Sequence, residues 1–126
     1  MMENEFQSSK PIYLQIADRI YYRLVRSELS PGDKLPSVRE MAVQMKVNPN
    51  TIQRTYSEME RLGIVETRRG QGTFIAERSD LKAELKDRLT KDVFKRFIQE
   101  MAELGLSPEE MLEGIKQYAE EANDES

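Results

Sequence analysis

The first strongly patterned stretch of the chain is amphipathic. Its apolar residues recur every four positions, a spacing that places them on one side of a helix. These residues are Ile12, Ile16, Ile20 and Leu24. Pro11 stands where proline suits the first turn, so we expect a helix over residues 11–27. The following SPGDKLP, residues 30–36, holds two prolines and a glycine and is expected to be a loop.

Two short helices follow, separated by a tight turn. Ser37 and Glu40 form the S-x-x-E pattern of a capping box, which predicts a helix over residues 38–45. In the turn KVNPN, Asn48 precedes a proline, which keeps it out of helical geometry and free to cap the next helix. That third helix is expected over residues 49–62. Such a brief connection between two short helices is typical of a helix-turn-helix.

A β-hairpin is predicted directly after the third helix. Residues 64–67 (IVET) and 73–75 (TFI) have the composition of short strands. The sequence RRGQG, residues 68–72, joins them as a glycine-containing hairpin loop. A helix-turn-helix followed by a β-hairpin is the element order of a winged helix.

The rest of the chain predicts two longer helices. Apolar residues recur every four positions from Leu81 to Phe97, which predicts a helix over residues 80–104. The sequence SPEE is a second helix-start signal and predicts a final helix over residues 108–122. The predicted fold class is therefore mostly α with a small β-hairpin: an N-terminal winged helix-turn-helix domain and a C-terminal two-helix dimerisation hairpin.

We place the boundary between the two domains after residue 77, giving domains 1–77 and 78–126. Charge separates them as well. Residues 1–78 carry 12 Lys and Arg against 10 Asp and Glu, whereas residues 79–126 carry 7 against 13. Opposite net charges in one chain of net charge −4 indicate that its two parts do different work.

The composition restricts the chemistry. The chain has no Cys and no His, which removes disulfides, zinc held by these residues and the commonest general base. Carboxylates lie on predicted helical faces without a phosphate-binding glycine loop, so we expect no enzyme, metal or cofactor. No apolar run is long enough to span a membrane, and the N-terminal MMENEF lacks a signal-peptide pattern. A soluble cytoplasmic protein without a membrane partner is expected.

The third predicted helix has an apolar and a polar side. The apolar side carries Ile52, Tyr56, Met59 and Leu62. The outward side carries Asn50, Gln53, Arg54, Ser57 and Arg61. The first residues of such a helix can enter the major groove of DNA, where Asn and Gln pair with adenine and Arg with guanine. A solvated helix face explains the same polar residues equally well in isolation, and Arg61, near the far end, suits a phosphate contact or none.

The predicted wing and the second helix add three cations. Arg68 and Arg69, beside Gly70 and Gly72, stand at the hairpin tip, where Arg can meet phosphates or a narrow minor groove. Arg39 stands at the start of the second helix. The alternatives are a solvated turn for the wing and a surface ion pair for Arg39.

The segment PGDKLPSVREMAVQMKVNPNTIQRTYSEMERLGIVETRRGQGTFIA, residues 31–76, resembles the DNA-binding domain of the GntR family of bacterial transcription regulators. The match rests on PG-x-x-LPS-x-RE, on V-x-x-NT at the turn, and on the glycine pattern ending in G-x-G-T-x-I. With the first helix, the resemblance covers residues from about 10 to 76. It implies a winged helix that contacts DNA.

The resemblance implies roles residue by residue. Arg39 matches an Arg that typically meets DNA, and Gln53 and Arg54 match variable positions, so their sequence preference is this protein's own. Pro49 stands where some relatives have Arg, so a base contact there is lost. The candidate DNA-binding residues, from the resemblance and the predicted faces together, are Arg39, Asn48, Asn50, Thr51, Gln53, Arg54, Ser57, Arg68, Arg69, Gly70, Gln71 and Gly72.

The short tail looks like that of the YtrA-type subfamily, in which two helices serve dimerisation. Independently, a two-helix hairpin cannot bury its apolar stripe alone and needs a partner surface. That surface is a second copy or, as the alternative, the rest of the same chain. The candidate dimerisation residues are Leu81, Leu85, Leu89, Val93, Phe94, Phe97, Ile98, Met101, Met111 and Ile115.

The leading hypothesis is a transcription regulator, a repressor, that binds a pseudo-palindromic double-stranded DNA operator as a homodimer. The resemblance implies regulation of a transporter operon. The alternative is a winged-helix module for protein–protein interaction, which predicts no salt-dependent DNA binding. A small-molecule effector of unknown identity is a further expected partner, between the tail and the DNA-binding domain. Its candidate lining residues, which are also ordinary core residues, are Phe97, Met101, Met111 and Tyr118.

Overall fold

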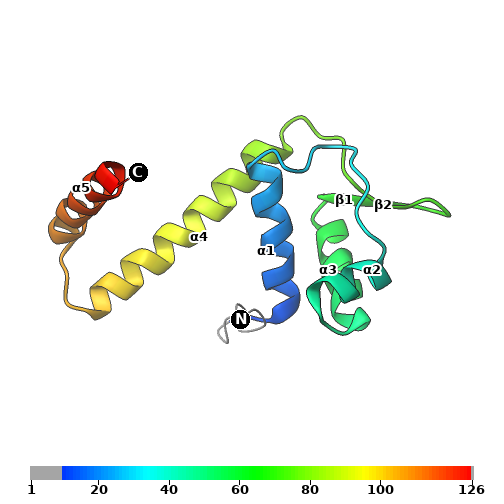
Figure 1. Cartoon of the computed structure of the whole chain (residues 1–126), viewed down its shortest axis with the longest axis horizontal. Coiled ribbons are helices and arrows are strands. Elements are labelled where there is room, and N and C mark those ends of the chain that lie inside the picture. The colour runs from blue at the N-terminus through cyan, green and yellow to red at the C-terminus, as the bar shows by residue number, and fades with distance from the viewer. Residues whose placement is uncertain (1–9, 126) are drawn as a thin grey trace. The chain divides into compact units, whose positions relative to one another are not determined.

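The computed structural model describes residues 10–125. In this part of the chain the elements are, in order, α1 (Ile12–Val25), α2 (Val38–Met45), α3 (Pro49–Arg61), β1 (Val65–Arg68), β2 (Gly72–Ile75), α4 (Leu81–Glu103) and α5 (Pro108–Glu125) (Figure 1). The chain divides into two compact units between Asp87 and Arg88. The predicted helices and the hairpin are confirmed, with ends shifted by a few residues.

The first unit is a winged helix. α1 and α2 both pack against α3, and the β1–β2 hairpin extends away from the three helices (Figure 1). Its interior includes fully buried side chains of α1, α3, β2 and the connection before β1, namely Ile16, Ile20, Ile52, Met59, Ile64 and Ile75, and α2 adds buried residues beside them. Burying side chains of this size contributes about 1.5–3 kcal/mol each, which fixes how α3 lies on α1.

Side-chain caps define where α2 and α3 begin. The Oγ atom of Ser37 accepts a hydrogen bond from the backbone N–H of Glu40 at 3.1 Å, and Glu40 Oε1 accepts one from the N–H of Ser37 at 2.8 Å. Asn48 Oδ1 accepts a hydrogen bond from the N–H of Asn50 at 2.7 Å, with Pro49 at the first helical position. Lys46 ends α2 in the left-handed conformation (φ 59°). The caps and the turn predicted from the sequence are confirmed.

The hairpin sheet has a third segment that the sequence did not indicate. β1 and β2 are antiparallel, with Val65 opposite Ile75 and Arg68 opposite Gly72. Along β2, a stretch of the SPGDKLP loop also pairs: the N–H of Leu35 donates to the carbonyl of Thr73 at 2.8 Å. The loop therefore supports the base of the wing.

The start of α4 belongs to the winged helix. Leu81 and Leu85 are fully buried, and both precede the division after Asp87. Arg78 donates hydrogen bonds to the carbonyl of Gly63 at 3.2 Å and to the carboxylate of Asp80 at 3.1 Å, and also contacts Glu84. These contacts are the reason why the first unit extends past the predicted boundary at residue 77.

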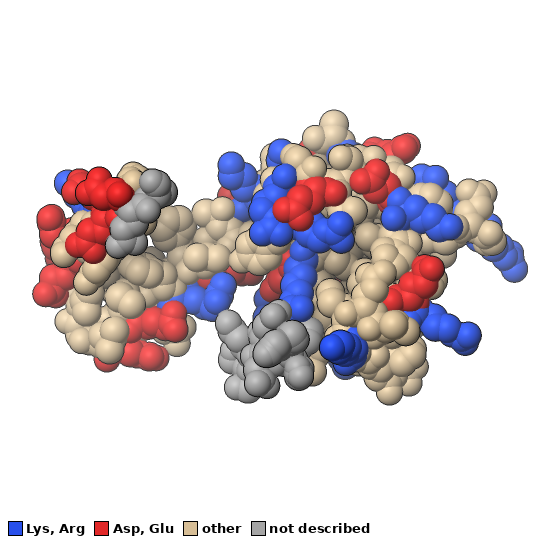
Figure 2. Space-filling model, viewed as in Figure 1, with Lys and Arg blue, Asp and Glu red and all other residues tan. Residues whose placement is uncertain are grey.

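The second unit consists of the remainder of α4 and of α5. Ser107 and Glu110 form a capping box at the start of α5, with hydrogen bonds of 2.8 and 3.2 Å. Met111 is buried, whereas most large apolar side chains of this unit are exposed. Figure 2 shows acidic side chains gathered over α5. None of the helices within residues 10–125 combines the length and apolar character that crossing a membrane requires.

Candidate nucleic-acid interface

The outward side of α3 is polar and exposed, as the helical wheel predicts. Asn50, Gln53, Arg54, Ser57 and Arg61 are all exposed, while Ile52, Tyr56 and Met59 are buried. Thr51 is half-buried. Gln53 and Ser57, one turn apart, are joined by a hydrogen bond of 3.3 Å from Nε2 to Oγ. The helix therefore presents a continuous row of hydrogen-bonding groups.

Thr55 is the one buried polar residue of this helix among those described, and the sequence did not single it out. Its Oγ1 atom lies 2.9 Å from the carbonyl oxygen of Tyr13 in α1 and 3.0 Å from that of Thr51. A buried hydroxyl without a partner would be costly, so this contact fixes α1 against α3. Tyr56 adds a second buried link, from its hydroxyl to the carbonyl of Pro36 at 2.7 Å. Burial raises the pKa of Tyr56, so this phenol remains a donor.

The two arginines of α3 have different surroundings. The Cζ atom of Arg54 lies 4.1 Å from the centroid of the Tyr13 ring. Arg61 is instead paired with Glu58, with Nη2–Oε2 at 2.6 Å and Nε–Oε1 at 3.1 Å. The Glu58 hydrogen bonds raise the pKa of Arg61. Arg54 thus keeps its N–H groups available, whereas Arg61 shares two of its donors with a neighbour.

The wing carries its two arginines in different ways. The guanidinium of Arg68 lies over Phe74, with Cζ 4.1 Å from the ring centroid, and Nη2 is 3.3 Å from Glu66 Oε1. Arg69 is exposed in the turn itself. Figure 2 shows basic side chains at the far end of the hairpin. Arg68 is the last residue of β1, next to the turn, but its guanidinium reaches back over Phe74, so Arg69 is the more freely exposed of the two predicted tip cations.

The wing glycines shape the backbone. Gly70 and Gly72 have φ values of +76° and +124°, which side-chain-bearing residues rarely adopt. A Cβ atom on Gly72 would also lie 2.9 Å from Cε of Lys34. Gln71 is exposed between the two glycines. We expect these glycines to contribute to DNA binding through the backbone conformation of the hairpin tip, which determines where Arg69 and Gln71 point.

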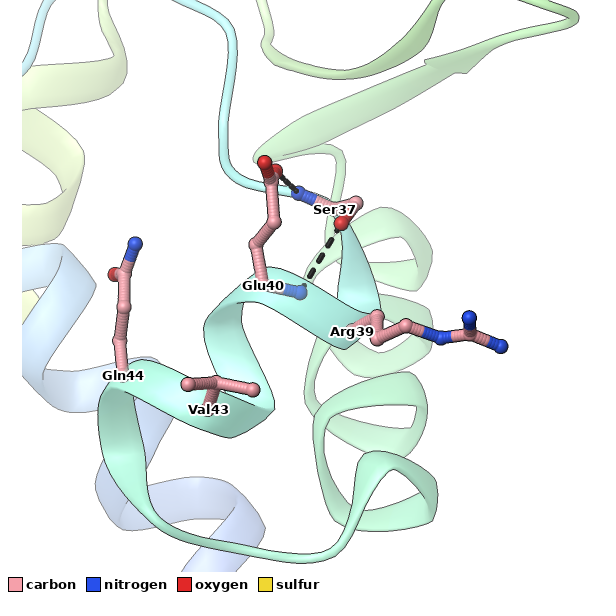
Figure 3. A pocket seen from close by; sticks show the side chains of 5 residues that line it. All are labelled: Ser37, Arg39, Glu40, Val43 and Gln44. Carbon is pink, nitrogen blue, oxygen red and sulfur yellow. Dashed lines mark hydrogen bonds between the residues drawn. The ribbon is translucent and has the colours of Figure 1, made fainter.

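The first turn of α2 presents Arg39 (Figure 3). A shallow hollow there is lined by Ser37, Arg39, Glu40, Val43 and Gln44. The Glu40 carboxylate is held by the N–H of Ser37, a bond that also lowers the pKa of Glu40. The Arg39 side chain points away from this carboxylate (Figure 3). The capping box thus draws the adjacent negative charge away from Arg39, which disfavours the alternative of an ion pair with Glu40.

The predicted dimerisation residues fall into two groups. Leu81, Leu85, Leu89 and Met111 are buried within the single chain. Val93, Phe94, Ile98 and Ile115 are exposed, and Phe97 and Met101 are half-buried. Of the predicted residues, only the second group therefore exposes apolar surface in the single chain.

The exposed polar side of α3 and the arginine-bearing hairpin define a winged helix-turn-helix of the kind that binds DNA. Residues 12–75 match the model of the family described as bacterial regulatory proteins, gntR family. The chain belongs to the GntR family, which confirms the resemblance read from the motifs.

Similar proteins match this chain over most of its length. The chain is 76% identical to an uncharacterized HTH-type transcriptional regulator, YhcF, of Bacillus subtilis, over 94% of this chain and 98% of that protein. It is 39% identical to the HTH-type transcriptional repressor YtrA of the same organism, over 94% and 92%. A GntR family transcriptional regulator from Listeria monocytogenes has a similar structure, with a TM-score of 0.78, 40% identity and coverage of 89% and 98%.

A more distant similarity concerns DNA directly. The DNA-binding domain of AraR, solved in complex with an operator, matches 56% of this chain and 89% of that chain, with a TM-score of 0.51 and 26% identity. The protein is therefore a DNA-binding transcriptional regulator of the YtrA type and not an enzyme.

Proposed function

We propose that the protein is a repressor that binds a pseudo-palindromic operator as a homodimer. The observation that carries the proposal is that one chain exposes two different surfaces. One is the polar side of α3 with the wing; the other is an apolar surface on the second unit. A two-fold dimer presents two such helices to two half-sites, which is how helix-turn-helix proteins read inverted repeats.

The surface that we assign to dimerisation is apolar and exposed. On α4, Val93, Phe94 and Ile98 are 44%, 54% and 51% exposed. Leu112, Ile115 and Tyr118 of α5 are also exposed. Several large apolar side chains exposed on two short helical segments favour an interaction site there. We name these six residues the apolar tail surface.

Charge favours a second copy as the occupant of the apolar tail surface. Residues 88–96 of α4 carry four Lys and Arg against one Asp. Residues 108–125, in α5, carry seven Asp and Glu against one Lys. A second copy laid with its α5 along this α4 brings opposite charges together, and complementary potentials favour one register over others.

The test is selection of bound sequences from a random DNA pool at physiological salt. An enriched inverted repeat supports the proposal and gives the operator. An enriched single half-site contradicts the dimer, and the absence of salt-dependent retention contradicts DNA recognition. In the last case the winged helix would serve as a protein–protein module. The repressor role is tested with a reporter gene placed behind the selected operator. Expression of the reporter should rise when the gene for this protein is deleted.

A transporter operon as the target, and a small-molecule effector, stay predictions. Of the four candidate lining residues, Met111 is 8% exposed and Tyr118 is 67% exposed. These two side chains stand in different environments in the single chain. Calorimetric titration of the purified protein with candidate metabolites, with and without operator DNA, tests the effector.

Arg54→Ala and Arg61→Ala should affect DNA binding differently. Arg54 has its donors free to pair with a base. Its loss should therefore cost about 1–3 kcal/mol of binding free energy on the preferred operator and weaken the sequence preference at one base pair. Arg61 is held by Glu58, so its replacement should leave the sequence preference unchanged. Competition binding over an operator library measures both. Equal losses over all sequences for both variants would contradict base recognition by Arg54.

A further inference from the structure

A tyrosine of α1 lies against an arginine of the outward side of α3. The Arg54 Cζ atom is 4.1 Å from the centroid of the Tyr13 ring, well within the range of a cation–π contact. Arg54 is exposed and Tyr13 is half-buried. The ring is therefore part of the protein's framework, while the guanidinium faces solvent.

The position of Tyr13 is fixed through the neighbour of Arg54. The buried Thr55 hydroxyl lies 2.9 Å from the Tyr13 carbonyl oxygen, which joins the first turn of α1 to the middle of α3. Ile16 and Ala17, in the next turn of α1, are buried. The backbone that carries this ring is thus held by a buried hydrogen bond and by the hydrophobic core.

Stacking on a ring orders an arginine without using its donors. A guanidinium presents its N–H groups at the edge of its plane, and a bidentate contact to guanine uses that edge. An aromatic ring stacks on the face of the guanidinium and leaves the N–H groups at its edge available. Glu58, by contrast, occupies two donors of Arg61. The environment of Arg54 is the one that suits contact with a base.

We propose that Tyr13 is a positioning residue for base recognition by Arg54. Its ring holds the guanidinium in one direction before DNA arrives, so less side-chain freedom is lost on binding. The inference rests on the proposed function and extends it to a residue outside the helix-turn-helix. It assigns to α1 a part in sequence preference as well as in packing.

The experiment compares binding preferences of variants over a library of the selected operator. Tyr13→Leu should weaken the sequence preference at the same base pair as Arg54→Ala does. We expect the ratio of affinities there to fall by about two- to five-fold, the range expected of an exposed cation–π contact. Tyr13→Phe keeps the ring and should retain the preference. In an Arg54→Ala background, Tyr13→Leu should cause no further loss of preference, because the partner is already gone.

The measured quantity and a control variant distinguish a positioning role of Tyr13 from a merely structural one. The preference is a ratio of affinities measured on one preparation, so partial unfolding of a variant does not change it. Tyr22→Leu, which alters an exposed tyrosine elsewhere on α1, is the matched control and should leave the profile unchanged.

Several outcomes would overturn the inference. A wild-type profile in Tyr13→Leu, beside a changed one in Arg54→Ala, shows that the ring does not position the arginine. Tighter or sharper binding by Tyr13→Leu shows that the ring holds Arg54 away from DNA. An unchanged profile in Arg54→Ala overturns the inference and leaves the proposed function standing. A wild-type protein without any sequence preference overturns both.

Discussion

Replacing Phe94 with Asp should make the protein a monomer and weaken its binding to a full inverted-repeat operator by about 10²–10⁴-fold. Phe94 is 54% exposed on α4, at the centre of the exposed apolar residues of that helix. A carboxylate there would have to lose its hydration on dimerisation without gaining a partner. Each half-site would then be bound separately, and the gain from linking two α3 helices would be lost.

Sedimentation velocity measures the oligomeric state, and titration of full and half operators measures the affinity. Gln99→Asp is the matched control, since it adds the same charge on the opposite side of α4 and should leave both properties unchanged. Phe94 is a sharper choice than Leu89, because Leu89 is buried in the single chain and its replacement would also disturb folding. A monomeric Phe94→Asp protein that binds the full operator as tightly as wild type would contradict the dimer model.

Most of the fold could be predicted because its signals are local. The repeat of apolar residues in α1 and α4, the Ser37–Glu40 capping box and the proline after Asn48 each act over one or two turns. Neighbouring residues alone determine them, and the structure confirms them. The two faces of α3 were predictable for the same reason, since a helix has a fixed period.

The contacts between distant segments could not be predicted. Leu35 pairs with Thr73, and Tyr13 lies under Arg54, through chain separations that carry no periodic signal. The stacking of one arginine of the wing could not be predicted for a related reason. The sequence places Arg68 beside Arg69, but the ring that draws Arg68 back belongs to Phe74, on the other strand.

The tail shows how one apolar pattern can serve two different partners. Leu81, Leu85 and Leu89 continue the same period as Val93 and Phe97, so the sequence assigned all of them to one surface. In the structure, Leu81 and Leu85 pack within the winged-helix unit, and exposed apolar side chains begin at Val93. Periodicity identifies the apolar side of a helix, but it does not identify what covers that side.

Leu85→Ala should lower the free energy of unfolding by about 2–5 kcal/mol, the cost of removing a large side chain from a core that cannot collapse around the cavity. Leu85 is fully buried in the single chain and lies in the first unit. We therefore expect the variant to dimerise at the same protein concentration as wild type, under conditions where it is folded. Lys86→Ala, an exposed neighbour on α4, is the control and should change stability by less than about 0.5 kcal/mol.

Denaturant unfolding at two protein concentrations separates the two possible roles of Leu85. If Leu85 belongs to the core of one chain, the loss of stability is the same at both concentrations. If it lies in the dimer interface, the variant's stability depends less steeply on concentration than that of wild type, because its weakened dimer dissociates before the chain unfolds. The second result would return Leu85 to the dimer surface and would mean that the winged-helix unit ends before α4.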